Sequence, residues 1–245
     1  MLSIINNQKK NHESTMGNLL VQSKNLSDVV QSAMYHPYHN ETYRVIDRLL
    51  PSTARENIPL SLILFKIEPF MQLIQLCEEQ QIWKLIEGLL TILMEQTPDV
   101  VYVDCVEVNE FIVLIPAVNP DQALTAGDEI CRRFHDMAKK MIRKKGLSLK
   151  LKGGLAVFPE DGENRLELFR IARAGIYQAS QKARQTVIRM QNDRLISKSA
   201  GYASYQVDQM YEIASLEGVS VDSFLREAFD CHLKRFILPA NTKGR

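Results

Sequence analysis

Cysteine is scarce in this 245-residue chain, and the four cysteines lie far apart. They form no Cys-x-x-Cys pair, and they are Cys77, Cys105, Cys131 and Cys231. This spacing argues against a disulfide framework or a zinc site, and it fits a protein of the reducing cytoplasm. His36 and His39 have no third ligand nearby, so solvated histidines are favoured over a metal site.

Long apolar runs and a large net charge are also absent. No apolar stretch approaches the roughly 20 residues that a bilayer span needs, and the first residues lack the apolar core of a signal peptide. Formal net charge is +1, so no global field favours nucleic acid or a membrane surface. We therefore expect a cytoplasmic globular protein without a membrane partner.

Hydrophobic periodicity predicts an α/β architecture. Residues 60–68 form an apolar strand, residues 100–116 a hairpin, and residues 149–157 a strand with a glycine pair that indicates a bulge or a close backbone approach. Val187 and Ile188 suggest one more short strand. The predicted helices span residues 41–50, 73–95, 123–141 and 166–179. Such a succession of strands and helices is typical of an α/β sandwich.

The last of these helices carries a recognisable motif. Residues 172–187 read ARAGIYQASQKARQTV, which resembles the ADxALYxAKxxGRNxV helix of the GGDEF domain, the family of diguanylate cyclases. The positions in register are Ala172, Tyr177, Ala179, Arg184 and Val187. The family's polar positions differ: its aspartate is Arg173, its lysine Ser180, and its glycine and asparagine are Ala183 and Gln185. The frame of the motif is kept better than its polar residues.

The strand at 60–68 is similar to the family strand that closes with DxDxFKxxND. The resemblance implies that its first aspartate, with a later carboxylate, holds the magnesium that bridges GTP phosphates. Here that position is Lys66, and an ammonium cannot be a ligand. Glu68 keeps the second acid, whereas Ile74 replaces an asparagine that reads the nucleotide. We therefore expect a packing helix here and little basis for nucleotide binding.

The predicted hairpin should hold the family signature. Its five positions read Glu107, Val108, Asn109, Glu110 and Phe111. Both glycines that let the backbone approach the nucleotide are missing, so a Cβ should crowd that space. Glu110 alone retains an acid, and we expect Lys66 to form an ion pair with Glu110 or Glu68 instead of a metal site.

A second GDE triplet, at residues 127–129, lies inside a predicted helix and is not assigned to the signature. Five cations in seven residues end this helix: Lys139, Lys140, Arg143, Lys144 and Lys145. Cations suit a helix C-terminus. We expect a solvated face here, and a phosphate-binding patch is the alternative.

Beyond a polar stretch, two short amphipathic helices are predicted, joined at Gly218 and with Ser220 as an N-cap. One face of the second helix holds Phe224, Leu225, Ala228, Phe229, Leu233 and Phe236. Residues 217–235 resemble the second half of a ribbon-helix-helix DNA-binding module, and the spacing also fits a helix-turn-helix. Two such helices cannot bury their apolar face alone, so they should pair with a second subunit, contact DNA, or dock on the first domain.

The predicted organisation is a mobile tail over residues 1–33, a GGDEF-like domain over 34–190, a linker over 191–200 and a helical appendage over 201–238. The resemblance implies a mixed or antiparallel sheet flanked by helices. We expect a non-enzymatic regulatory or interaction protein without metal or cofactor, a homodimer, with DNA or a protein as a further partner. The alternative is a sensor of GTP or cyclic di-GMP, or a residual cyclase, that still uses Glu68, Glu110 and Arg184.

Overall fold

The computed structural model describes residues 41–95, 102–107, 109–182, 186–190 and 199–237. The predicted tail lies outside this part of the chain, as does most of the predicted linker. The chain divides into two compact units, residues 1–191 and residues 192–245, and each is described by itself. Within the described residues, no helix combines the length and the apolar character needed to cross a membrane.

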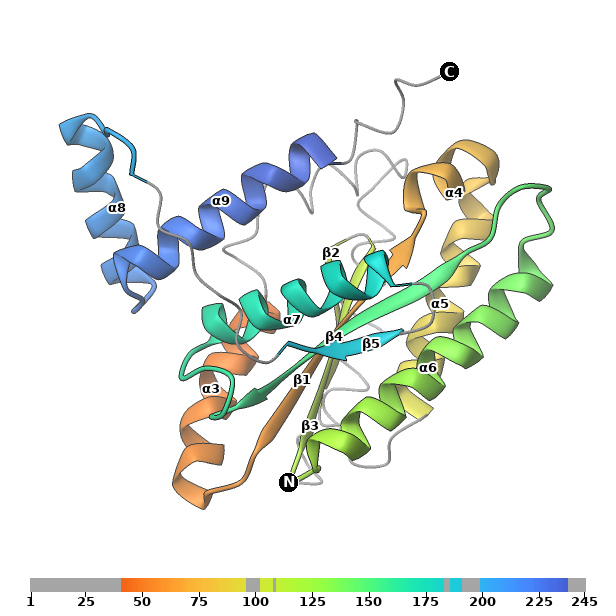
Figure 1. Cartoon of the computed structure of the whole chain (residues 1–245), viewed down its shortest axis with the longest axis horizontal. Coiled ribbons are helices and arrows are strands. Elements are labelled where there is room, and N and C mark those ends of the chain that lie inside the picture. The colour runs from red at the N-terminus through yellow and green to blue at the C-terminus, as the bar shows by residue number, and fades with distance from the viewer. Residues whose placement is uncertain (1–40, 96–101, 108, 183–185, 191–198, 238–245) are drawn as a thin grey trace. The chain divides into compact units, whose positions relative to one another are not determined.

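A five-stranded sheet in the order β2-β3-β1-β4-β5 forms the centre of the first unit (Figure 1). Its strands are β1 (Leu60–Glu68), β2 (Tyr102–Glu107), β3 (Glu110–Pro116), β4 (Lys150–Phe158) and β5 (Val187–Arg189). Neighbouring strands are antiparallel except β4 and β5, which are parallel. A helix crosses between those two strands, as a parallel pair requires. This confirms the predicted α/β fold with a mixed sheet.

Helices cover both faces of this sheet (Figure 1). The first-unit helices are α3 (Glu41–Glu56), α4 (Phe70–Leu76), α5 (Glu79–Glu95), α6 (Pro120–Met141) and α7 (Arg165–Gln181). One apolar cluster joins the sheet to α4, α5 and α6. A second cluster joins its other face to α3 and α7. The two clusters make the sheet the middle layer of three.

Side chains of β1 alternate between these two clusters. Ile63, Phe65 and Ile67 contribute to the cluster under α5 and α6, whereas Leu62 and Leu64 contribute to the cluster under α3 and α7. Because alternate residues of a strand share a face, Lys66 and Glu68 continue the α3/α7 face at the end of the strand. The apolar pattern of the sequence therefore decides where these charges point.

The backbones of α7 and β4 touch at a pair of glycines. A Cβ on Gly154 would lie 1.7 Å from the carbonyl oxygen of Ala172, and a Cβ on Gly175 would lie 2.8 Å from the Gly154 Cα. No side chain fits at either position. β4 pairs with β1 without a register shift. The Gly153–Gly154 pair predicted from the sequence therefore marks a close backbone approach and not a bulge.

Two helix boundaries differ from the sequence prediction. The helix predicted over residues 73–95 is two helices, because the backbone of Cys77 is extended at φ −118° and ψ 151°. Apolar spacing continues across this break, so periodicity did not reveal it. The helix predicted to end at Leu50 continues through Pro51 to Glu56, and Pro51 is accommodated on the exposed side of α3.

The GDE triplet at 127–129 lies inside α6, as predicted. Its aspartate has a structural task. Asp128 accepts hydrogen bonds from the Thr186 hydroxyl and from the Val187 backbone N–H, the latter at 3.2 Å. These bonds hold the start of the edge strand β5 against α6.

The second unit contains the predicted helical hairpin, α8 (Ser204–Leu216) and α9 (Val221–Ile237). Gly218 has a φ of 66° between the helices, and the Ser220 hydroxyl accepts the Ser223 N–H at 3.1 Å, as expected of an N-cap. On the predicted interface face, Phe229 and Leu233 are 62% and 39% exposed. Phe224, Leu225 and Ala228 are half-buried, and the side chain of Phe236 lies outside the described part.

Candidate functional site

The positions of the predicted signature lie at the β2–β3 turn, beside the end of β1. Glu107 ends β2, Glu110 begins β3, and the two are register partners across the turn. The carbonyl of Asn109 accepts a hydrogen bond from the Ile67 N–H at 3.0 Å, which fixes the turn to β1. Phe111 is fully buried in the cluster under α5 and α6. The last signature position therefore anchors the hairpin in the core.

A row of three charged residues crosses the sheet next to this turn. Lys66 of β1 is the register partner of Glu110 on β3 and of Lys152 on β4. Register partners point to the same face, so the row faces α7. The Lys152 ammonium donates a hydrogen bond to the Lys182 carbonyl oxygen at 3.1 Å. Burial lowers the pKa of Lys152, a neighbouring lysine lowers it further, and Glu68 opposes both effects.

The cation beside the signature carboxylates is Arg173 of α7. Its Nη2 lies 3.6 Å from Oε1 of Glu107, and its Nε lies 3.8 Å from Oε2 of Glu110. Glu110 is only 3% exposed, and the guanidinium carbon lies 5.2 Å from the ring centre of Phe169.

The prediction that Lys66 forms an ion pair with Glu110 or Glu68 is wrong. Glu110 instead forms an ion pair with Arg173. The reason is geometric: α7 crosses this face of the sheet directly above the row, and a long planar guanidinium with several donors can approach both carboxylates from there.

Glu68 has a different partner. The hydroxyl of Ser180 donates a hydrogen bond to its Oε1 at 2.9 Å, so the fold brings two predicted site positions together. Ile74 is not brought to them, because it packs from α4 against the cluster on the opposite face. Val108 and Arg184 lie outside the described residues.

Cys105 lies in β2 behind the turn. Its Sγ donates a hydrogen bond to the Glu107 carbonyl oxygen at 2.8 Å. Burial raises the pKa of this thiol, and the nearby carboxylates of Asp104, Glu107 and Glu110 raise it further. Because the thiolate is the nucleophilic form, a raised pKa disfavours covalent chemistry at Cys105.

These charges do not fit a magnesium ion, which takes hard oxygen ligands in an octahedral array. Lys66 stands where the family resemblance implies a metal-binding aspartate, and the Arg173 guanidinium lies against Glu110. Across the described ranges, no group of three or more His, Cys, Asp or Glu side chains could hold a metal ion. What the arrangement does is join the hairpin, β1 and α7 through ion pairs and hydrogen bonds.

Sequence reasoning missed the part that Arg173 and Lys152 take in this site. A signal existed for Arg173, because it replaces the aspartate of the family's helix motif. Neither its contact with Glu107 and Glu110 nor the burial of Lys152 could be derived from spacing alone, since both depend on how α7 lies across the sheet.

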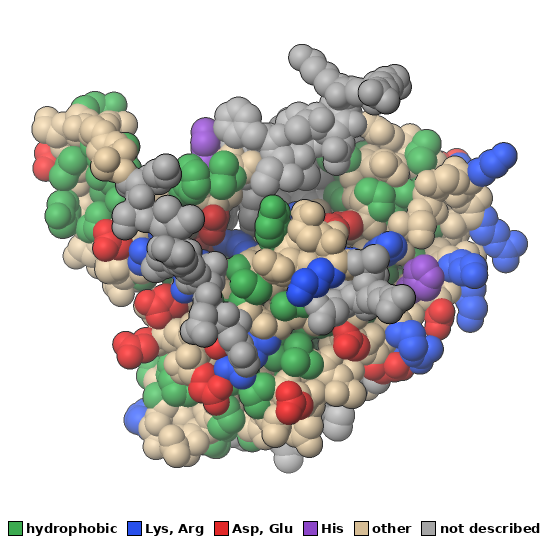
Figure 2. Space-filling view, viewed as in Figure 1, with side chains coloured by type: hydrophobic (Ala, Val, Ile, Leu, Met, Phe, Trp, Pro, Cys, Tyr) green, Lys and Arg blue, Asp and Glu red, His purple; other side chains and the backbone are tan. Residues whose placement is uncertain are grey.

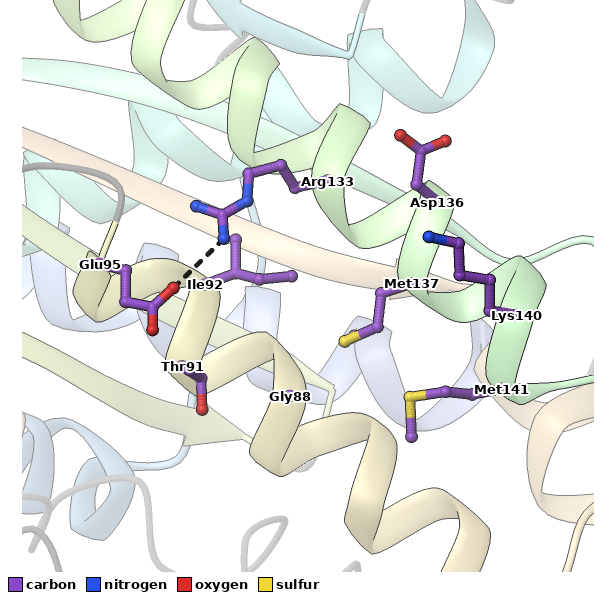
Figure 3. Close-up of a pocket in the computed structure, with 9 residues that line it drawn as sticks. All are labelled: Gly88, Thr91, Ile92, Glu95, Arg133, Asp136, Met137, Lys140 and Met141. Carbon is purple, nitrogen blue, oxygen red and sulfur yellow. Dashed lines mark hydrogen bonds and ion pairs between the residues drawn. The ribbon is translucent and has the colours of Figure 1, made fainter.

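An open groove lies between α5 and α6, on the face of the sheet opposite α7 (Figure 3). This open groove has a volume of about 510 Å³ and is lined by Gly88, Thr91, Ile92, Glu95, Arg133, Asp136, Met137, Lys140 and Met141. An ion pair of 3.2 Å between Arg133 and Glu95 joins the two helices at one end. Its floor is apolar and its rim mixes both charges, so the groove presents no cluster of catalytic groups.

Comparisons with known proteins agree with this architecture. A family model described as the GGDEF domain of diguanylate cyclases matches residues 44–186. The active GGEEF domain of a diguanylate cyclase from Vibrio cholerae is similar with a TM-score of 0.55 and 15% identity, covering 62% of this chain and 96% of that one. A GGDEF domain from Pseudomonas aeruginosa is similar with a TM-score of 0.50 and 18% identity, covering 62% and 94%. At these identities the two structures show the fold alone. No curated relative matches the sequence.

Proposed function

We propose that this chain, which belongs to the GGDEF domain family of diguanylate cyclases, acts as a non-catalytic regulatory or interaction protein. The observation that carries the proposal is Arg173, whose guanidinium lies 3.6 and 3.8 Å from the two signature carboxylates. A cation there repels a divalent metal and takes its place beside Glu110. Phosphoryl transfer depends on metal ions that neutralise the phosphates, and neither Arg173 nor Lys66 can be a metal ligand.

The direct test is incubation of the full chain with GTP and magnesium or manganese. We expect no cyclic dinucleotide above a blank without protein. Glu110→Ala is the matched control, because Glu110 is the one acid left at the signature's metal position. Product made by the wild type and abolished in this variant would refute the proposal.

Calorimetry with GTP and with cyclic di-GMP separates the proposal from a nucleotide sensor. We expect no heat of binding from either ligand, because the nucleotide-reading position holds Ile74, an apolar side chain that packs against the core. Binding that Glu68→Ala or Glu110→Ala weakens would favour the sensor instead.

The interaction role is proposed for the α8–α9 hairpin. Besides Phe229 and Leu233, Tyr211 and Leu216 of α8 are 63% and 80% exposed. Burying a Phe or Leu side chain is worth roughly 1.5–3 kcal/mol, and grouped apolar side chains mark interfaces. We expect a second copy of the chain to cover them, since symmetric self-contact is the commonest form of assembly. DNA binding by the paired helices is the further role that the ribbon-helix-helix resemblance implies.

Light scattering tests the hairpin. The full chain should be a dimer, whereas Phe229→Asp and a chain lacking residues 200–245 should be soluble monomers. Leu76→Asp is the matched control, because Leu76 is an exposed apolar residue of the first unit and its loss should leave the dimer intact. A monomeric full chain, or a truncated chain that precipitates, would refute the role of the hairpin.

A further inference from the structure

The first unit contains a strongly basic stretch that the proposed function does not use. Between Asp136 and Glu160 the sequence has no acid and seven cations: Lys139, Lys140, Arg143, Lys144, Lys145, Lys150 and Lys152. Since formal net charge is only +1, the rest of the chain is negative overall. The positive charge of this protein is therefore concentrated in one segment.

Six of these cations gather around the loop between α6 and β4. Lys139 and Lys140 lie in the last turn of α6, the next three cations lie in the loop that follows, and Lys150 begins β4. All six are exposed, and we call them the basic patch: Lys139, Lys140, Arg143, Lys144, Lys145 and Lys150. Figure 2 shows Lys and Arg side chains gathered at the right of the view, over this end of α6. Lys152 alone is buried.

No acid among the described residues forms an ion pair with a cation of the basic patch, whereas the arginines that precede them in α6 do form ion pairs. Arg132 pairs with Glu129 and Asp136 at 2.5 and 3.0 Å, and Arg133 pairs with Glu95 at 3.2 Å. Cations stabilise a helix dipole only when they lie in or next to its last turn. The cations of the loop after α6 are therefore more than its dipole requires. Crowded like charges repel, and a bound polyanion relieves that repulsion.

We propose that the basic patch binds the phosphate backbone of duplex nucleic acid without reading its sequence. Five of its six members are lysines, which meet phosphates as point charges and lack the planar fork of arginine. Residues 132–152 expose no large apolar or aromatic side chain. This segment therefore offers no large exposed side chain on which unpaired bases could stack or which could insert into a bilayer. A dense, regular row of phosphates is the partner that such a charge array fits.

Fluorescence anisotropy of the full chain with two labelled duplexes of unrelated sequence tests this. Both should bind equally well, and affinity should fall steeply as salt rises, by a log–log slope of about 0.9 per phosphate contact. The variant K139Q/K140Q/K144Q/K145Q should reduce that slope by about 3–4 and weaken binding at least about tenfold at low salt.

The matched control is R44Q/R48Q/R55Q/K84Q, which removes four exposed cations from α3 and α5 and changes net charge equally. It should keep both the affinity and the salt slope. Equal losses in the two variants, or no binding by the wild type at low salt, would overturn the proposal. Patch-dependent binding to anionic lipid vesicles without duplex binding would also overturn it.

The test also separates this proposal from DNA binding through α8 and α9. Duplex binding that Phe229→Asp abolishes and the patch variant leaves unchanged would assign the contact to the hairpin and overturn the present inference. Loss in the patch variant, with the dimer intact by light scattering, would support the patch independently of the hairpin.

Discussion

The two ends of β1 differ in what surrounds them. From Leu60 to Phe65 every residue is buried, and the alternate side chains enter two apolar clusters. At the other end, Lys66 and Glu68 are half-buried among charges that come from β3, β4 and α7. The two apolar clusters and the glycine contact form the frame of this fold, whereas the charged end joins the hairpin, β1 and α7 through polar contacts.

The largest effect is expected from Gly154→Ala, in the frame. The added Cβ would lie 1.7 Å from the Ala172 carbonyl oxygen, so α7 would have to move away from the sheet. We expect a loss of about 3 kcal/mol or more in the free energy of unfolding, measured by urea denaturation. Gly201→Ala is the control, because a Cβ there meets nothing within 4 Å. Equal stability of the two variants would mean that the glycine contact does not hold the frame.

The next effect concerns the charged end. Arg173→Met removes the guanidinium that lies 3.8 Å from Glu110, which is 3% exposed, and breaking a buried pair from one side costs about 3 kcal/mol. Arg173→Met combined with Glu110→Leu should recover most of that loss, because the buried carboxylate is then removed together with the guanidinium. A double-mutant cycle by urea denaturation measures the coupling. Additive losses would show that the two side chains do not interact.

The frame could be predicted from the sequence, and the partners at the charged end could not. The apolar run at 60–68 and the helical spacing at 166–179 are local patterns, and both gave elements in the right place. Apolar spacing also ran across Cys77, where the backbone breaks the helix, so periodicity alone overestimated that helix. The partner of Glu110 depends on the path of α7 over the sheet. Lys66 is its neighbour in register, yet Glu110 forms an ion pair with Arg173.

Two substitutions of Lys66 test how much this side chain interacts with Glu110. Lys66→Met should change the free energy of unfolding by less than about 0.5 kcal/mol, because Lys66 is half-buried and Arg173 already faces Glu110. Lys66→Asp should cost up to about 1 kcal/mol more, since like charges directly opposite on neighbouring strands repel. Thermal or urea denaturation separates them. A loss in Lys66→Met as large as that in Arg173→Met would make Lys66 the main partner after all.

A gradual effect, spread over several pH units, is carried by Lys152. Burial lowers the pKa of its ammonium in the folded chain, whereas the unfolded chain keeps the ordinary value of about 10.4. Between these two values the unfolded chain binds more protons than the folded chain, so stability contributed by this group rises with pH. At neutral pH, Lys152→Met should change stability by less than about 1 kcal/mol, because the lost hydrogen bond to Lys182 opposes the relief from burying a charge. From about pH 7 to pH 10, the wild type should gain stability relative to the variant. Urea unfolding of both proteins across that range measures the difference, and a constant or falling difference would show that Lys152 is solvated in the folded chain.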